Sequence, residues 1–381
     1  GSAQKESETA IEKALADKRR GRVRGVVVAG CHAQRFGQTL AERFPGIDAI
    51  VGVSAFADIA EAARAALARS EDSKEAEQKT WIQLHPPTSI EVADDARLRL
   101  TPSHWAYLRI SEGCDHACTF CAIPSFRGKY RSKPLEQILL EAKELVSSGA
   151  SELLVIGEDT SYYGTDLYGK RGLADLLKAL DALKGLRWIR LMYAYPTCLD
   201  SDMIGAMARL DRVAKYVDVP LQHTASSVLK RMGRKETRED IFRLVDSLRK
   251  GMPSIAIRST FIAGFPGETP QEHAQLLADL ADLKLDRVGC FPYSTEGNEA
   301  ANRLDGAVDE KTRVRRRNAI MELQQKVSWD KNRARIGSTC EVVVDGPHPK
   351  AKGVWIGRSE MEAPEIDGQI EVRAKDLVSG Q

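Results

Sequence analysis

The sequence is poor in the features that mark several protein classes. It has only seven cysteines in 381 residues, and aromatic residues make up 6% of the chain. No apolar run approaches the roughly 20 residues that span a bilayer, so we expect no membrane partner. The 56 Lys and Arg residues nearly balance the 54 Asp and Glu residues, and a net charge of +2 favours neither nucleic acid nor an anionic surface. The sparse cysteines exclude a disulfide-rich secreted scaffold and indicate a reduced, cytoplasmic protein.

The composition that is present predicts an ordinary globular chain. Hydrophobic residues make up 43% and charged residues 29%, over a length that suits two or three domains. Gly1-Ser2 has the form of a cloning remnant, and we expect the natural first domain to begin upstream of Ala3.

Three cysteines are concentrated in one short run. Cys114, Cys118 and Cys121 have the spacing C-x3-C-x2-C and follow the expected strand 105–110. Three thiolates suit an iron–sulfur cluster, because a cubane held by three cysteines keeps its fourth iron open to a small ligand. We expect the chemistry at that open iron.

The cysteine run has two other interpretations, a zinc site and a disulfide. Structural zinc requires four ligands, and His116 inside the loop would complete a Cys3His set, although the spacing is unusual and no second C-x2-C follows. A structural disulfide is disfavoured, because three neighbouring cysteines pair badly. The isolated Cys31, Cys198, Cys290 and Cys340 are expected to be small buried residues by default.

The first 69 residues predict a small α/β domain. Helical patterns cover 8–19, 40–43 and 55–68, and apolar strand-like runs cover 25–29 and 47–53. Residues 70–98 contain the charged stretch SEDSKEAEQK and Pro86-Pro87, and we predict that they form an interdomain linker.

The segment 99–335 predicts an α/β fold in which strands alternate with helices. Such alternation is typical of a parallel sheet, and six units suggest a partial (β/α)6 barrel. A capping box at Thr269–Glu272, with Pro270 at the first helical position, marks the start of the last covering helix. The expected strands are 106–110, 152–156, 188–192, 216–219, 255–262 and 287–291.

The C-terminal part is expected to form a long helix followed by short strands. A long helix is predicted over 309–335, and its arginines fit a solvated or docking face better than nucleic-acid binding. Short strands at 339–344, 353–356 and 369–372 then predict a small β-barrel domain over 336–381, which ends too soon for five complete strands.

The cysteine run, the aromatic Phe120 before its third cysteine and the strand context together resemble the radical S-adenosylmethionine (SAM) superfamily. The resemblance implies a [4Fe–4S] cluster on Cys114, Cys118 and Cys121, whose open iron is chelated by SAM, and a reductive cleavage of SAM that yields a 5′-deoxyadenosyl radical. It further implies SAM contacts at strand ends, where ligands of such barrels collect. We expect these contacts from Phe120, Gly157, Glu158 and Gln222; a carboxylate such as that of Glu158 can accept hydrogen bonds from the SAM ammonium.

The whole chain is similar to the methylthiotransferases within that superfamily. Gly30-Cys31-His32-Ala33-Gln34-Arg35, the radical core and a final TRAM domain match their three-domain design. That resemblance implies a second, auxiliary [4Fe–4S] cluster, for which Cys31 is the one ligand in this sequence. It also implies that SAM is used twice, once to methylate a sulfur on the auxiliary cluster and once to remove hydrogen from the substrate.

The family has two branches, which modify different substrates. The run Asp218-Val219-Pro220-Leu221-Gln222-His223 resembles the branch that adds a methylthio group to the β-carbon of an aspartate in a small-subunit ribosomal protein. From residue 336 on there are eight acidic and five basic residues, which favours a basic protein partner, free or within the ribosome, over phosphate. An electron donor is also required. The alternatives are a tRNA adenosine methylthiotransferase, the one reading with a nucleic-acid partner among the enzymes, and a non-catalytic zinc-stabilised protein that binds RNA or the ribosome.

Overall fold

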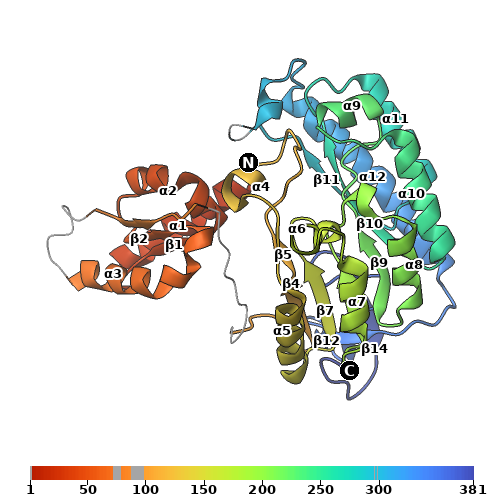
Figure 1. Cartoon of the computed structure of the whole chain (residues 1–381), viewed down its shortest axis with the longest axis horizontal. Helices are drawn as coiled ribbons and strands as arrows, with labels where there is room; N and C mark the ends of the chain where they lie inside the picture. The colour runs from red at the N-terminus through yellow and green to blue at the C-terminus, as the bar shows by residue number, and fades with distance from the viewer. Residues whose placement is uncertain (1, 72–78, 87–97, 296, 298) are drawn as a thin grey trace.

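The computed structural model describes residues 2–71, 79–86, 98–295, 297 and 299–381. Three units follow one another along the chain, each with its own sheet, and Figure 1 shows the first unit beside the large central one. We call them the N-terminal unit, the core and the C-terminal unit. The α/β class predicted from sequence is confirmed, and the predicted small C-terminal β-domain is present as a three-stranded antiparallel sheet.

The N-terminal unit is a three-stranded parallel sheet with helices around it. Its strands lie in the order β1-β2-β3, and its core gathers Ile11 of α1, Leu40 of α2 and Ile50 of β2. Its elements are α1 (Ser2–Arg19), β1 (Val27–Ala29), α2 (Cys31–Arg43), β2 (Ala49–Val51), η1 (Val53–Asp58), α3 (Ile59–Glu71) and β3 (Trp81–Gln83).

The predicted linker 70–98 is wrong in part. Trp81–Gln83 forms β3 and pairs in parallel with β2, in the register Ile50 to Ile82. A three-residue strand next to charged residues has no periodicity to reveal it, and its pairing depends on β2, a strand distant in the sequence. The rest of the predicted linker falls mainly on 72–78 and 87–97, which lie outside the described residues.

The core contains the six parallel strands expected for the open barrel. Their order is β11-β10-β9-β8-β7-β4, so each strand pairs with the next one along the chain that belongs to this sheet. The strands are β4 (Trp105–Arg109), β7 (Glu152–Ile156), β8 (Trp188–Leu191), β9 (Val213–Asp218), β10 (Ala256–Ala263) and β11 (Arg287–Pro292). All six overlap the predicted ranges.

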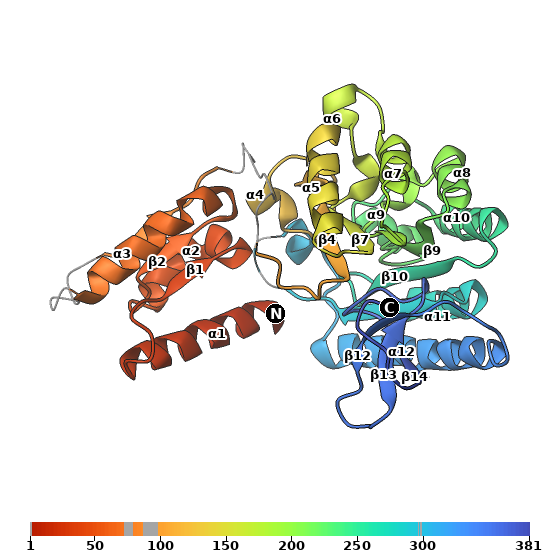
Figure 2. The ribbon, with the colours of Figure 1, turned by 90° about the horizontal axis from the view of Figure 1, so that it is seen from below.

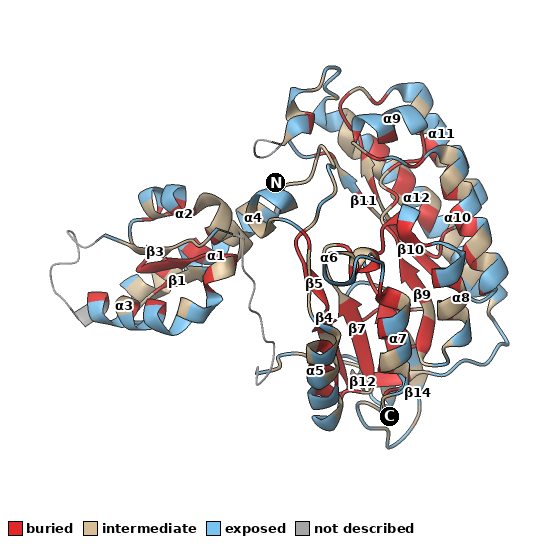
Figure 3. Ribbon diagram, in the orientation of Figure 1, coloured by how far each residue is buried: buried red, intermediate tan, exposed pale blue. Residues whose placement is uncertain are grey.

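Helices cover the convex face of this sheet and bury one continuous apolar layer. Ala106, Leu108, Leu153, Val155 and Ile189 alternate along their strands and face that layer. Figure 3 shows the buried strands enclosed by helices with exposed outer faces. The covering helices are α5 (Leu135–Ser147), α7 (Leu173–Asp181), α8 (Ser201–Arg209), α10 (Arg238–Gly251) and α11 (Pro270–Leu283). The predicted capping box of α11 is confirmed, with reciprocal bonds between Thr269 and Glu272.

The C-terminal unit lies under the core (Figure 2). The long helix α12 (Glu310–Ala334) runs along β10 and β11 and leads into it. Its antiparallel strands are β12 (Val343–Pro347), β13 (Val354–Arg358) and β14 (Ile370–Arg373).

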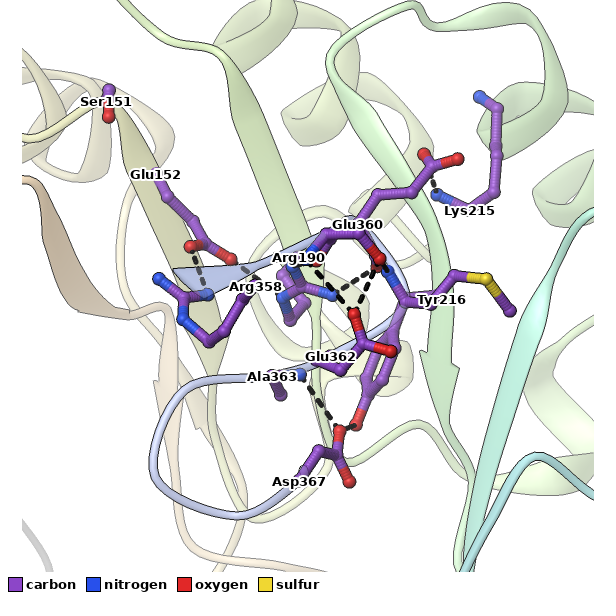
Figure 4. Close-up of polar contacts among 12 residues, drawn as sticks. Ser151, Glu152, Arg190, Lys215, Tyr216, Arg358, Glu360, Glu362, Ala363 and Asp367 are labelled. Carbon is purple, nitrogen blue, oxygen red and sulfur yellow. Dashed lines mark hydrogen bonds and ion pairs between the residues drawn. The ribbon is translucent and has the colours of Figure 1, made fainter. Parts of the chain in front are cut away.

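Residues 359–367, between β13 and β14, reach into the concave side of the core sheet (Figure 4). Arg190 donates to the carbonyl oxygen of Glu360 at 2.6 Å, and the hydroxyl of Tyr216 donates to Asp367 at 2.7 Å. Ala363 is fully buried with Met192 and Tyr216. The C-terminal unit is therefore packed into the core and is not a loose appendage.

This packing overturns the charge argument made from sequence. Six of the eight acidic side chains that gave the C-terminal unit its negative balance contact core residues: Glu341 with Arg187, Asp345 with His104, Glu360 with Lys215, Glu362 with Arg287, Glu365 with Tyr107 and Asp367 with Tyr216. Because these carboxylates already contact residues of the core, the net charge of the C-terminal unit says little about the charge of a partner.

Candidate functional site

The cysteine loop, residues 113–121, follows β4 and is fixed by a neighbouring strand. The short strands β5 (Ser111–Glu112) and β6 (Arg131–Ser132) pair beneath it, and Cys114 donates its N–H to the carbonyl of Gly128 at 3.2 Å. Gly113 has φ +78°, and a Cβ there would lie 2.2 Å from the carbonyl oxygen of Lys129. Only glycine fits this turn, which lets the loop pack directly on its neighbour.

The structure brings the three cysteines of the run together. Cys114, Cys118 and Cys121 line one cavity of about 790 Å³, together with Gln34 and Arg35 of the N-terminal unit. Burial raises the pKa of all three thiols, that of Cys114 to about 12, while Arg234 opposes the rise at Cys118. Within the described residues, no three Cys, His, Asp or Glu side chains form a site for a single metal ion. A larger group bridging three thiols fits a cavity of this size and donor set, and its binding would displace the thiol protons.

His116, the fourth ligand in the zinc interpretation, contacts a carboxylate and an aromatic ring. Its Nε2 lies 2.7 Å from Oδ2 of Asp159, and its ring stacks on Tyr195 with 3.7 Å between the ring centroids. The contact occupies only one ring nitrogen, but no three Cys, His, Asp or Glu side chains in the described part of the chain are arranged around a single metal ion, which disfavours the Cys3His site.

Glu158 lies directly beside the cysteine loop, at the end of β7. Its Oε2 accepts the N–H of Gly113 at 2.9 Å. Burial and the nearby Glu112 raise the pKa of its carboxyl group, whereas Arg127 opposes them. Gly157 is also fitted closely, since a Cβ there would lie 2.4 Å from Oγ of Ser111. The strand end thus presents a largely buried carboxylate next to the three thiols.

Gln222 and Phe120, the other two predicted cofactor contacts, lie on the same side of the core. Gln222 has φ +69°, unusual for a residue with a side chain, and its backbone is held between Thr260 and Ile262 of β10. Phe120 packs edge-on against Phe265, with 6.3 Å between the centroids. Strained backbone persists only where its surroundings over-determine it, and it clusters at functional sites.

Two further strand-end features are structural. His223 is fully buried, and its Nδ1 accepts the N–H of Ala225 at 2.9 Å. Glu268 accepts the N–H of Phe265 at 3.0 Å and pairs with Arg316 of α12. Both side chains hold turns of the core, so neither is assigned to the site.

Cys31 lies at the first position of α2 and is half-buried. Its sulfur lies 3.0 Å from Nη2 of Arg127, which belongs to α4 (Ile123–Arg127) after the cysteine loop. Of the other isolated cysteines, Cys198 and Cys290 are buried as expected, whereas Cys340 is exposed.

The charged residues around the cysteine loop were not predicted from the sequence as part of the site. Glu112 and Asp159 are almost fully buried, Arg127 pairs with Glu112, and Arg234 lies over Tyr195 at 4.3 Å. Glu112 and Arg127 flank the cysteine run closely in the sequence, and this proximity was the one indication of their role. Asp159 and Arg234 are distant in the sequence and reach the loop only through the fold.

Comparison with family models agrees with this geometry. Residues 108–280 match the radical SAM superfamily, and residues 336–381 match the TRAM domain. None of the helices in the described part of the chain has the length and apolar character needed to cross a membrane.

Curated relatives match almost the whole chain. The ribosomal protein uS12 methylthiotransferase RimO of Pelotomaculum thermopropionicum is 41% identical, over 97% of this chain and 81% of that protein. The protein of the same name from Clostridioides difficile is 38% identical, over 98% of this chain and 82% of its own length. Among solved structures, the cobalamin-dependent radical SAM enzyme OxsB has a TM-score of 0.53 at 13% identity, covering 91% of this chain and 53% of that one. The last likeness concerns the fold alone.

Proposed function

The chain belongs to the radical SAM family of ribosomal protein uS12 methylthiotransferases, and we propose on this premise that it transfers a methylthio group to the β-carbon of an aspartate in that ribosomal protein. Members of this family use SAM and [4Fe–4S] clusters. The observation that carries the proposal is the convergence of three thiols and a buried carboxylate at the carboxyl end of the core sheet.

We assign the [4Fe–4S] cluster of the core to Cys114, Cys118 and Cys121. The cavity they line is large enough for a multi-iron group, and the N–H of His116 lies 3.4 Å from the sulfur of Cys114. When bound, the cluster supplies the electron that cleaves SAM and so generates the hydrogen-abstracting radical. Hydrogen bonds to the sulfurs and the buried surroundings tune its potential.

The second assignment is that of the SAM contacts. We infer that Glu158 accepts hydrogen bonds from the SAM ammonium; the support is that Gly113 anchors its carboxylate beside the cysteine loop. Gly157, Phe120 and Gln222 complete the proposed contacts. Cys31 is assigned to the auxiliary cluster of the family.

The partner is a small-subunit ribosomal protein, free or within the ribosome, and the reaction takes place in the cytoplasm with a cellular electron donor. No observation on the structure favours tRNA. The test is anaerobic turnover of the reconstituted full-length protein with SAM, a chemical reductant and either uS12, small ribosomal subunits or tRNA. We expect one methylthio group in place of one hydrogen on an aspartate of uS12, read by mass spectrometry of its peptides. Modification of tRNA with uS12 unchanged would contradict the proposal.

A further inference from the structure

We propose that Arg127 is a positioning residue that joins the N-terminal unit to the SAM site by holding Cys31, Glu112 and Glu158 together. This inference rests on the proposed function only for the role of Glu158. The contacts themselves come from three separate segments: α2, the strand pair β5–β6 and the end of β7.

Each nitrogen of the Arg127 guanidinium meets a different group. Nη1 donates to Oε1 of Glu112, Nη2 lies 3.0 Å from the sulfur of Cys31, and Nε lies 3.7 Å from Oε1 of Glu158. The side chain of Arg127 is only 23% exposed, so these contacts are partly shielded from water. A planar guanidinium with a fixed fork of donors can serve Glu112 and Cys31 at once while its charge faces Glu158 at a distance too long for a hydrogen bond, which a lysine ammonium on a flexible stem does poorly.

The two carboxylates need this cation. Glu112 and Glu158 are 5% and 16% exposed at their side chains, and their mutual repulsion works against the ionised form of Glu158. Arg109 binds the other oxygen of Glu112 at 2.6 Å, so Glu112 is held from both sides. Arg127 makes ion-pair contacts with both carboxylates. Removing it leaves two neighbouring buried carboxylates with less compensation.

The same arginine fixes where the N-terminal unit meets the core. Helix α4 contacts α2 and η1, and Arg127 is the last residue of α4. Arg35 of α2 makes a second contact with the core, 2.5 Å from Glu299. Because Nη2 is bound to Cys31 and Nε faces Glu158, a displacement of Cys31 would move the group that orients the carboxylate of the SAM site.

The experiment is a double-mutant cycle on SAM binding, measured by calorimetry on the anaerobically reconstituted protein without uS12. We expect R127Q to raise the Kd for SAM about tenfold, and R127K to restore little of that loss, because the fork and not the charge alone is needed. In the E158Q background, R127Q should change the Kd less than twofold. R171Q is the matched control, since it removes another arginine from a half-exposed pair, with Asp200, outside this site.

A second readout does not depend on the cofactors. Hydrogen exchange of the protein without metal should be faster in R127Q than in wild type for the amides of α2 from Gln34 on, where the helical hydrogen bonds begin, and unchanged in R171Q. Additive effects of R127Q and E158Q on SAM affinity, or an unaltered exchange of α2, would overturn the inference. Failure of the proposed function would instead appear as absence of methylthiolated uS12 with the SAM-binding cycle intact.

Discussion

Glu152 of β7 and Arg358 of β13 form a fully buried ion pair that joins the core to the C-terminal unit. Nη1 of Arg358 lies 2.7 Å from Oε2 of Glu152, and the other oxygen accepts Nε of Arg190 at 2.7 Å (Figure 4). All three side chains are at most 2% exposed. One carboxylate thus holds two arginines, and Asp345 holds Arg358 from the other side at 2.8 Å.

Replacing Glu152 should therefore destabilise the protein strongly. E152Q leaves two buried guanidinium groups with reduced compensation, and breaking a buried pair costs about 3–5 kcal/mol. The measurement is the denaturant midpoint followed by circular dichroism. The matched control is R187Q, which breaks the exposed pair with Glu341 at the same junction and should cost below about 1 kcal/mol. Equal midpoints for E152Q and R187Q would contradict the role given to burial.

The cysteine loop should be separable from the fold. Changing Cys114, Cys118 or Cys121 to Ala should abolish reductive SAM cleavage and lower the iron content, while the circular dichroism spectrum keeps its shape, because the apolar layer of the core lies elsewhere. C340A, at the exposed cysteine, is the control and should keep both iron and cleavage. Release of 5′-deoxyadenosine by a variant lacking all three cysteines would refute the cluster assignment.

Glu158 should contribute to SAM affinity. E158A removes the proposed acceptor of the SAM ammonium and should weaken binding by about 1.5–3 kcal/mol, the scale of a charge-assisted hydrogen bond. That corresponds to a roughly 10- to 150-fold higher Kd by calorimetry. Iron content should be retained. E136A, on the exposed side of α5, serves as the control. If E158A binds SAM as tightly as wild type, Glu158 has only the structural bond to Gly113.

His223 should make the stability of the core depend on pH. Burial lowers the pKa of its imidazole from the ordinary 6.5 to about 4, against the attraction of Glu268 and Glu272. Between these values the unfolded chain binds the proton and the folded chain does not, so stability is complete above about pH 6.5 and is lost as the pH falls toward 4. H223Q should flatten the change of the denaturant midpoint between pH 7 and 4.5. Parallel profiles for H223Q and wild type would show that another group is responsible.

Charge reversals in the C-terminal unit should have different effects at buried and at exposed carboxylates. Lysine at Glu362 or Asp367 should disrupt the junction, since these carboxylates bind Arg287 and Tyr216 in the core. Lysine at the exposed Glu371 should change the free energy of unfolding by less than about 1 kcal/mol. The three variants are compared by thermal unfolding, and only E371K is suited to a test of uS12 association. A thermal midpoint of E362K equal to that of E371K would contradict the packing described above.

The sequence by itself determined the features that depend on local spacing. Three features could be predicted because each depends on residues that are close together in the sequence. They are the strands of the core, the capping box of α11 and the run of three cysteines. The motif-based resemblance led to the family that the relatives confirm. The assignment of Cys31, Glu158 and Gln222 to cofactors remains a prediction.

The tertiary structure alone decided which side chains meet across the chain. Strand β3 exists because β2 offers it a partner, and acidic residues of the C-terminal unit pair with arginines or accept hydrogen bonds from tyrosines far away in sequence. His116 was turned to Asp159, and Arg127 was brought to Cys31 and Glu158, by the packing of separate strands and helices. A charge or a histidine read in isolation carries no record of its partner, because burial and pairing are properties of the folded chain.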